Sequence, residues 1–171
     1  MPHKIRIANT ISESIVDGPG LRYVIFTQGC LKHCLNCHNP LTWDLNGGKL
    51  VEVSSFYEDI LQNPLLQGIT LSGGEPFLQP EACLEIVKFA KENNLDTVVY
   101  SGYYLEELRE MHNETIDKLL KEIDYLVDGP FENELRDLRL LFKGSRNQRF
   151  IDLKETLKSG KIITLYEQIE E

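Results

Sequence analysis

The sequence contains no apolar run close to the roughly 20 residues that a membrane-spanning helix requires. Its first residues, 1–7, lack the longer apolar stretch of a secretory signal peptide. Basic residues are outnumbered, with 18 Lys and Arg against 27 Asp and Glu, and the net charge of −9 argues against general affinity for nucleic acids. We therefore expect a soluble, cytoplasmic protein that has neither a membrane nor a nucleic acid as a partner.

Cysteine is also rare, with four in 171 residues, yet three of the four lie in one loop, residues 29–40. Cys30, Cys34 and Cys37 have the spacing C-x3-C-x2-C, and in a reducing cytoplasm clustered cysteines are more often metal ligands than disulfides. They could hold a structural zinc ion, with a neighbouring histidine or Cys83 as the fourth ligand. We favour a [4Fe–4S] cluster, because full protein ligation needs four cysteines, so that three leave one iron open to a substrate. Cys83 itself lies among apolar residues and is expected to be a buried small hydrophobe.

The pattern of apolar residues predicts strands that alternate with helices. Strands are predicted at 21–28, 68–72, 96–101, 125–127 and 149–153, and helices at 54–62, 80–94 and 105–122, the last with a possible break near 112–113. The chain begins with a short extended segment, and the β-prone tail at 162–166 is not assigned. Alternating elements imply βαβ units and a largely parallel sheet.

Chain length limits the size of that sheet. A complete eight-unit barrel takes about 250 residues, whereas this chain has 171. We therefore expect an α/β fold, a partial, open parallel β/α barrel of about five to six units. It should form one domain over residues 1–171, in which the role of the tail at about 154–171 is open.

Special sequences follow four of the predicted strands: the cysteine loop 29–40, Gly73-Gly74-Glu75, Ser101-Gly102 and Asp128-Gly129. Ligand sites of parallel α/β sheets lie at the carboxyl ends of the strands, so these segments should meet at one rim. Two adjacent glycines let backbone approach a ligand closely, and a carboxylate beside them suits an ammonium group. The Gly-x-x-x-x-Gly-Lys-Ser/Thr pattern of a phosphate-binding loop is absent.

The three cysteines after the first confident strand, together with Ser72-Gly73-Gly74-Glu75-Pro76 after the next, resemble the radical S-adenosylmethionine (SAM) superfamily. Within it, the chain resembles the family of anaerobic ribonucleoside-triphosphate reductase-activating proteins. The segments that carry this second resemblance are spread from about residue 7 to 153: DGPGLR (17–22), FTQGC (26–30), CHNP (37–40), YSGY (100–103), LVDGPF (126–131) and KGSRNQ (143–148).

The resemblance implies roles for individual residues. Cys30, Cys34 and Cys37 would ligate three irons of a [4Fe–4S] cluster, and SAM would chelate the fourth iron through its amino and carboxylate groups. The implied SAM contacts are Asn36, Cys37 and His38 for the adenosine, Gly73, Gly74 and Glu75 for the methionine amino group, and Ser101, Asp128 and Asn147 for the ribose or carboxylate. Many members of the superfamily carry an aromatic residue where this chain has Asn36, so the contact there would come from backbone.

The resemblance also implies a reaction and a partner. The reduced cluster would transfer one electron to SAM, giving methionine and a 5′-deoxyadenosyl radical that removes a hydrogen atom from a glycine. That glycine would belong to the catalytic subunit of an anaerobic ribonucleotide reductase, and a flavodoxin or ferredoxin would supply the electron. A loop of the partner could enter the uncovered side of a partial barrel.

Three alternative functions stay open. The partner could be another glycyl-radical enzyme, such as pyruvate formate-lyase, although activases of that type usually run longer. A small-molecule radical SAM enzyme, such as a 7-carboxy-7-deazaguanine synthase, would need no partner. A zinc-stabilised binding module would leave Gly73-Gly74-Glu75 without a role.

Overall fold

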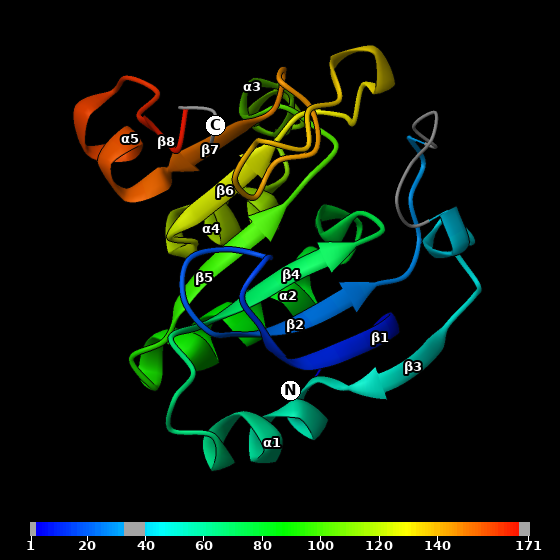
Figure 1. Cartoon of the computed structure of the whole chain (residues 1–171). Helices are drawn as coiled ribbons and strands as arrows, with labels where there is room; N and C mark the ends of the chain where they lie inside the picture. The colour runs from blue at the N-terminus through cyan, green and yellow to red at the C-terminus, as the bar shows by residue number, and fades with distance from the viewer. Residues whose placement is uncertain (1–2, 33–39, 168–171) are drawn as a thin grey trace.

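An eight-stranded mixed sheet forms the centre of the protein in a computed structural model, which describes residues 3–32 and 40–167 (Figure 1). The strand order is β3-β1-β2-β4-β5-β6-β7-β8. The strands are β1 (Lys4–Ser14), β2 (Arg22–Thr27), β3 (Lys49–Glu52), β4 (Gly68–Gly73), β5 (Asp96–Tyr100), β6 (Tyr125–Asp128), β7 (Arg149–Asp152) and β8 (Thr164–Leu165).

Helices connect the strands in the middle of the chain and follow β7. The α-helices of the described residues are α1 (Tyr57–Gln62), α2 (Pro80–Glu92), α3 (Leu105–Glu110), α4 (Glu114–Glu122) and α5 (Leu153–Ser159). The short 3-10 helices are η1 (Pro40–Thr42), η2 (Val53–Phe56), η3 (Pro76–Leu78) and η4 (Asn133–Leu135). Over residues 3–32 and 40–167, no helix is both long enough and apolar enough to cross a membrane.

Only the middle of the sheet is parallel. Strands β2, β4, β5 and β6 run parallel to one another, whereas β1 and β3 on one side and β7 and β8 on the other pair antiparallel. The connection between β1 and β2, residues 15–21, is too short for the crossover that parallel neighbours need. The predicted α/β class is therefore confirmed, but the expected number of five to six parallel units is too large for the described sheet.

Most of the predicted elements are present, with ends shifted by one or two residues. The helix predicted at 105–122 is broken between α3 and α4, where His112 has a φ of 49°. Asn113 then caps α4, because its side-chain oxygen accepts hydrogen bonds from the N–H groups of Thr115 and Ile116. The break that the sequence indicated near 112–113 is therefore confirmed.

Strand β1 is the largest difference from the prediction, with 11 residues where a short extended start was expected. Beyond Ile7 its side chains are largely polar and exposed, so the alternation typical of a half-buried strand is weak. Helix α5 was also not predicted. It has seven residues, begins where Asp152 accepts a hydrogen bond from the Glu155 N–H, and ends at Gly160.

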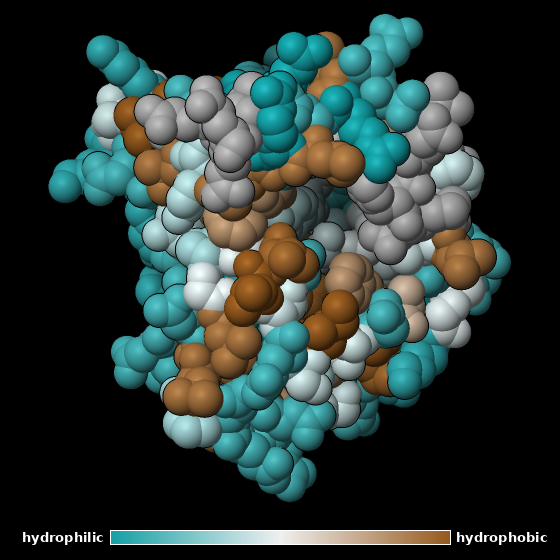
Figure 2. All heavy atoms as spheres, in the orientation of Figure 1, coloured by the Kyte–Doolittle hydropathy of each residue, from teal (hydrophilic) through white to brown (hydrophobic). Residues whose placement is uncertain are grey.

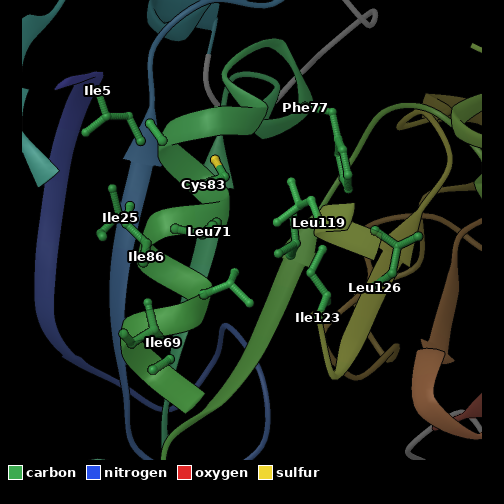
Figure 3. Packing of buried hydrophobic residues seen from close by; sticks show 14 of the residues in the cluster. Ile5, Ile25, Ile69, Leu71, Phe77, Cys83, Ile86, Leu119, Ile123 and Leu126 are labelled. Carbon is green, nitrogen blue, oxygen red and sulfur yellow. The ribbon is translucent and has the colours of Figure 1, made fainter. Parts of the chain in front are cut away.

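The helices cover one face of the sheet. Successive strand residues point to opposite faces, and on the helix side the strand residues Ile25, Leu71, Val99 and Leu126 share one buried cluster with residues of all five described α-helices. Figure 3 shows Ile86 of α2 packing beside strand residues of this cluster. On the other face, Val98, Val127 and Phe150 form a second, smaller cluster. The connection 15–21 crosses this second face in front of the strands (Figure 1).

Candidate functional site

A cavity of about 500 Å³ lies where the four parallel strands end. Its lining includes Cys30 after β2, Gly73 and Gly74 at the end of β4, Ser101 and Gly102 after β5, and Gly129 after β6. Figure 2 shows this face hollowed near its centre, with hydrophobic residues beside the hollow. The four segments that the sequence placed at one rim therefore meet around one cavity.

The ends of the cysteine loop are joined by backbone hydrogen bonds. The Gly29 N–H donates to the Thr42 carbonyl at 2.5 Å, and the Cys30 N–H donates to the Trp43 carbonyl at 3.2 Å. Both Cys30 and Trp43 line the cavity. The predictions for residues 33–39, which concern Cys34, Asn36, Cys37 and His38, lie outside the described residues.

Two glycines let β4 end directly against the cysteine segment. Gly73 has a φ of +92°, which favours glycine, and a methyl group on Gly74 would collide with the Gly29 carbonyl. The Gly74 N–H donates to the Thr27 carbonyl at 2.8 Å, and the Glu75 N–H donates to the Gly29 carbonyl at 2.7 Å. Backbone without side chains therefore lines the cavity beside Cys30.

The Glu75 carboxylate points away from solvent, since the residue is only 1 % exposed. It accepts hydrogen bonds from the Gly102 N–H at 2.7 Å, the Phe77 N–H at 3.1 Å and the Ser101 hydroxyl at 3.0 Å. Burial raises the pKa of Glu75 to about 7, although these donors and the charge of Lys32 oppose the shift. The contact with a methionine amino group that the sequence predicted for Glu75 stays a prediction.

Asp128 is fully buried beside the cavity and forms contacts within the protein. Its carboxylate accepts a hydrogen bond from the Leu105 N–H at 2.8 Å, at the start of α3, and forms an ion pair with Arg149 at 2.5 Å. Among the described residues it is the neighbouring Gly129, not Asp128, that lines the cavity. The predicted contact of Asp128 with SAM stays a prediction.

The segment 143–148, which the sequence singled out as KGSRNQ, is bonded to the end of β6. Gln148 accepts a hydrogen bond from the Gly144 N–H at 2.8 Å and donates one to the Gly129 carbonyl at 3.0 Å. Asn147 donates to the Pro130 carbonyl at 2.8 Å, and its own side-chain oxygen is buried with no hydrogen-bond partner among the described residues. Asn147 is not among the residues that line the cavity, and its predicted contact with SAM stays a prediction.

Several residues that line the cavity were not among the site residues predicted from the sequence. Lys32 lines the cavity, with its ammonium 4.7 Å from the centre of the Tyr103 ring and 3.7 Å from Glu107. Lys143 also lines it and donates to the Tyr166 carbonyl at 2.9 Å, and burial lowers the pKa of this lysine. The apolar part of the lining includes Phe26, Trp43, Phe131, Leu140 and Phe142. The one sequence signal for Lys32 is its position between Cys30 and Cys34.

The described part of the cavity fits an iron–sulfur cluster with a small organic ligand. A thiol, close-packed glycine backbone and a cation lie along its wall, and its volume is typical of a small-molecule site. The residues described include no group of three or more His, Cys, Asp or Glu side chains placed to hold a metal ion. Cys83, the alternative fourth zinc ligand, is fully buried in the core, and its thiol contacts the Pro76 carbonyl at 3.4 Å. The expectation that it is a buried hydrophobe is confirmed.

Comparison with known proteins agrees with this chemistry. Residues 16–151 match the family described as a 4Fe–4S single cluster domain. The anaerobic ribonucleoside-triphosphate reductase-activating protein of Escherichia coli (strain K12) is 37% identical over 145 residues, which are 78% of this chain and 90% of that protein. The protein of the same description from Enterobacteria phage T4 is 34% identical over 141 residues, 78% of this chain and 85% of its own length. The pyruvate formate-lyase-activating enzyme of Clostridium pasteurianum is 37% identical over 133 residues, 74% of this chain but only 56% of that enzyme.

Proposed function

The chain belongs to the family of 4Fe–4S single-cluster proteins that includes the anaerobic ribonucleoside-triphosphate reductase-activating proteins. We therefore propose that it activates an anaerobic ribonucleotide reductase by generating a glycyl radical on it. The partner would be the catalytic subunit of that reductase. The protein would act in the cytoplasm as a single domain, and a flavodoxin or ferredoxin would supply its electron. The relatives that bear this name support the proposal, since the match extends over 90% of the one from E. coli.

The observation that carries the proposal is the cavity at the strand ends, where Cys30 lies beside the backbone of Gly73 and Gly74. In the proposal, Cys30, Cys34 and Cys37 hold a [4Fe–4S] cluster, and the two glycines face the methionine part of SAM. When bound, these groups supply one-electron reductive cleavage of a carbon–sulfur bond and removal of a hydrogen atom from a glycine.

The remaining contacts with SAM follow from the same proposal. Asn36, Cys37 and His38 would meet the adenosine, and Ser101, Asp128 and Asn147 would meet the ribose or the carboxylate. The side-chain oxygen of Asn147, which is buried and has no partner within residues 3–32 and 40–167, supports this assignment for Asn147, because a ribose hydroxyl could donate to it. For Asp128, whose carboxylate already binds Arg149, any such contact would be shared with the ion pair.

The chain itself would bind the reactants, orient them and exclude water. Phe131, Leu140 and Phe142 form an apolar wall of the cavity, which suits a reaction that must be kept from solvent. Lys32 is held in place by Glu107 and Tyr103 and would attract the anionic part of a ligand. The protein residues thus supply a dry, oriented site and the cofactors supply the chemistry.

We further infer that the sheet is the open part of a β/α barrel whose uncovered side admits the partner. Two observations support this inference: the helices cover one face only, and the cavity is lined from the other face. Val16, on the cavity wall, is 72% exposed, and Leu138 on a nearby connection is 83% exposed. A loop of the partner could pass between such side chains and complete the enclosure.

The proposal is tested by anaerobic reconstitution with iron and sulfide, followed by addition of a strong reductant and SAM. We expect methionine and 5′-deoxyadenosine from the wild type and none from Cys30→Ala, Cys34→Ala or Cys37→Ala. Cys83→Ala is the matched control and should retain cleavage, since that thiol lies in the core. Fully reconstituted protein that cleaves no SAM, or protein that holds zinc instead, would contradict the proposal.

Activation of pyruvate formate-lyase is a second candidate, because the relative from C. pasteurianum is as similar in identity as the relative from E. coli. Incubating the reconstituted chain separately with each partner enzyme and recording the glycyl-radical signal by electron paramagnetic resonance separates the two. A signal on the reductase alone supports the first proposal. A signal on the lyase alone would replace it by the second. Cleavage that depends on an added small substrate, with no signal on either protein, would favour a small-molecule radical SAM enzyme.

A further inference from the structure

The Glu75 carboxylate joins two segments that line the cavity from different strands. Glu75 follows Gly73 and Gly74 at the end of β4, and its donors Ser101 and Gly102 follow β5, 26 and 27 residues later in the chain. Gly74, Ser101 and Gly102 line the cavity, and the carboxylate lies behind them with an exposure of 1 % for the whole residue. The Glu75 side chain therefore connects the two cavity-lining segments from the side that faces away from the cavity.

Both carboxylate oxygens are already used by donors of the protein. One oxygen accepts from the Gly102 N–H at 2.7 Å and lies 3.1 Å from the Ser101 hydroxyl. The other accepts from the Phe77 N–H at 3.1 Å and lies 3.0 Å from the same hydroxyl. Glu75 is not among the residues that line the cavity, so to reach a ligand there its carboxylate would have to move away from these buried N–H groups and leave them without an acceptor, which is costly.

Ser101 extends this bridge toward α3. Its hydroxyl oxygen accepts a hydrogen bond from the Tyr103 N–H at 3.0 Å while its proton is donated to Glu75. The turn 101–103 is therefore fixed from one side by the carboxylate. The side chain of Lys32, from the cysteine segment, also lies close to Gly102.

We propose that Glu75 is a positioning residue, which holds the Ser101-Gly102 turn against Gly73-Gly74 so that the backbone of both segments faces one ligand. It does so instead of contacting the amino group of that ligand directly. The identity of the ligand as SAM rests on the proposed function, whereas the bridge itself does not depend on it.

The first test uses the full chain without iron or ligand. Hydrogen exchange of the Gly102 amide, the Phe77 amide or both should be at least roughly tenfold faster in Glu75→Gln than in the wild type, because one acceptor oxygen is replaced by an NH2 group that faces an N–H donor. Asp124→Asn is the matched control: Asp124 accepts from the Thr97 N–H at 3.0 Å, at the opposite end of β5. It should leave the exchange of Gly102 unchanged. Unaltered exchange of both the Gly102 and the Phe77 amides in Glu75→Gln would overturn the proposal.

The second test separates positioning from direct contact, in the cluster-loaded chain. The affinities of SAM and of its deaminated analogue, in which hydrogen replaces the amino group, are measured by titration calorimetry. Positioning predicts that Glu75→Gln weakens both ligands by the same factor, of about tenfold, and that Asp124→Asn weakens neither. A loss for SAM that is absent for the analogue would show direct contact with the amino group and would overturn the proposal.

A second variant keeps the test decisive if Glu75→Gln does not fold. Ser101→Ala removes one donor and leaves the carboxylate, so positioning predicts an equal, smaller loss for both ligands. A gain in affinity for SAM alone would contradict it, because it would mean that a freed carboxylate binds the amino group. If the wild type bound neither ligand, the proposed function would fail. The hydrogen-exchange test would still show whether Glu75 holds the Ser101-Gly102 turn in place.

Discussion

Replacing Gly74 with alanine should displace the segment that carries Cys30. The new methyl group would collide with the Gly29 carbonyl oxygen and lie 2.9 Å from the carbonyl carbon and 3.0 Å from the Gly29 nitrogen. Carbon atoms in contact prefer separations of about 3.5 Å or more, so Gly29 would have to move by at least about 0.6 Å. Its carbonyl also accepts the Glu75 N–H at 2.7 Å, a hydrogen bond that this movement would weaken.

The cost can be estimated from these two effects. Overpacking costs about 1–3 kcal/mol, and a buried hydrogen bond adds about 1 kcal/mol, so urea unfolding should show a loss of about 2–4 kcal/mol. A shift of a catalytic segment by even part of an ångström lowers rates strongly, so SAM cleavage should fall by about tenfold or more. Iron content per chain after reconstitution should fall as well, because Cys30 directly follows Gly29.

Gly160→Ala is the control for a loss of stability that does not reach the site. Gly160 has a φ of +75° at the end of α5, and a methyl group there would meet no atom within 4 Å. Its strain should cost about 1 kcal/mol and leave iron content and SAM cleavage unchanged. If Gly74→Ala kept wild-type stability, iron content and cleavage, the reasoning from close backbone contact would be refuted.

Three further predictions concern buried side chains. Cys83→Ser should cost about 1–2 kcal/mol in urea unfolding and leave the iron content unchanged, whereas lost iron would show that this thiol is a ligand. Arg22→Met should cost about 3–5 kcal/mol, because the fully buried guanidinium binds three backbone carbonyls and an aspartate, and a loss below 1 kcal/mol would contradict this. Burial raises the pKa of Glu75 from 4.5 to about 7, so the folded chain keeps this proton longer than the unfolded chain. The stability that this proton contributes, about 3 kcal/mol, is complete below pH 4.5 and is lost as the pH rises through 7. In the metal-free chain, where the charge of Lys32 acts on this carboxylate, Glu75→Gln should remove that part of the pH dependence, and an unchanged slope would refute it.

Short-range patterns predicted the parallel middle of the sheet well. In β2 and β4, apolar residues such as Ile25 and Leu71 face the helices, and runs of this kind are typical of strands that are buried on both sides. The breaking residues were equally informative, since Asn113 both interrupts a long helical pattern and caps the helix that follows. Each of these features depends on residues that are neighbours in the chain.

The edges of the sheet were not predictable in the same way. Strand β1 has few buried side chains beyond Ile7, so its length depends on hydrogen bonds to β2 and β3. Strand β8 has only two residues, and its pairing with β7 is what defines it as a strand. Tertiary pairing, which local propensity does not report, decides such strands.

The sequence by itself determined which chemistry the chain can carry. Three cysteines in one loop and two adjacent glycines after a strand are local patterns, and their meeting at one rim follows from the common direction of parallel strands. Only the tertiary structure decided what the polar side chains at that rim do. Glu75 accepts from Ser101 and Gly102, 26 and 27 residues away, as well as from nearby Phe77. Asp128 accepts from Leu105, 23 residues away, so the orientation of both carboxylates depends on which strands are neighbours. The reason is physical: a buried carboxylate must be satisfied by whatever donors the fold brings near it, and most of the donors to these two carboxylates are distant in the chain.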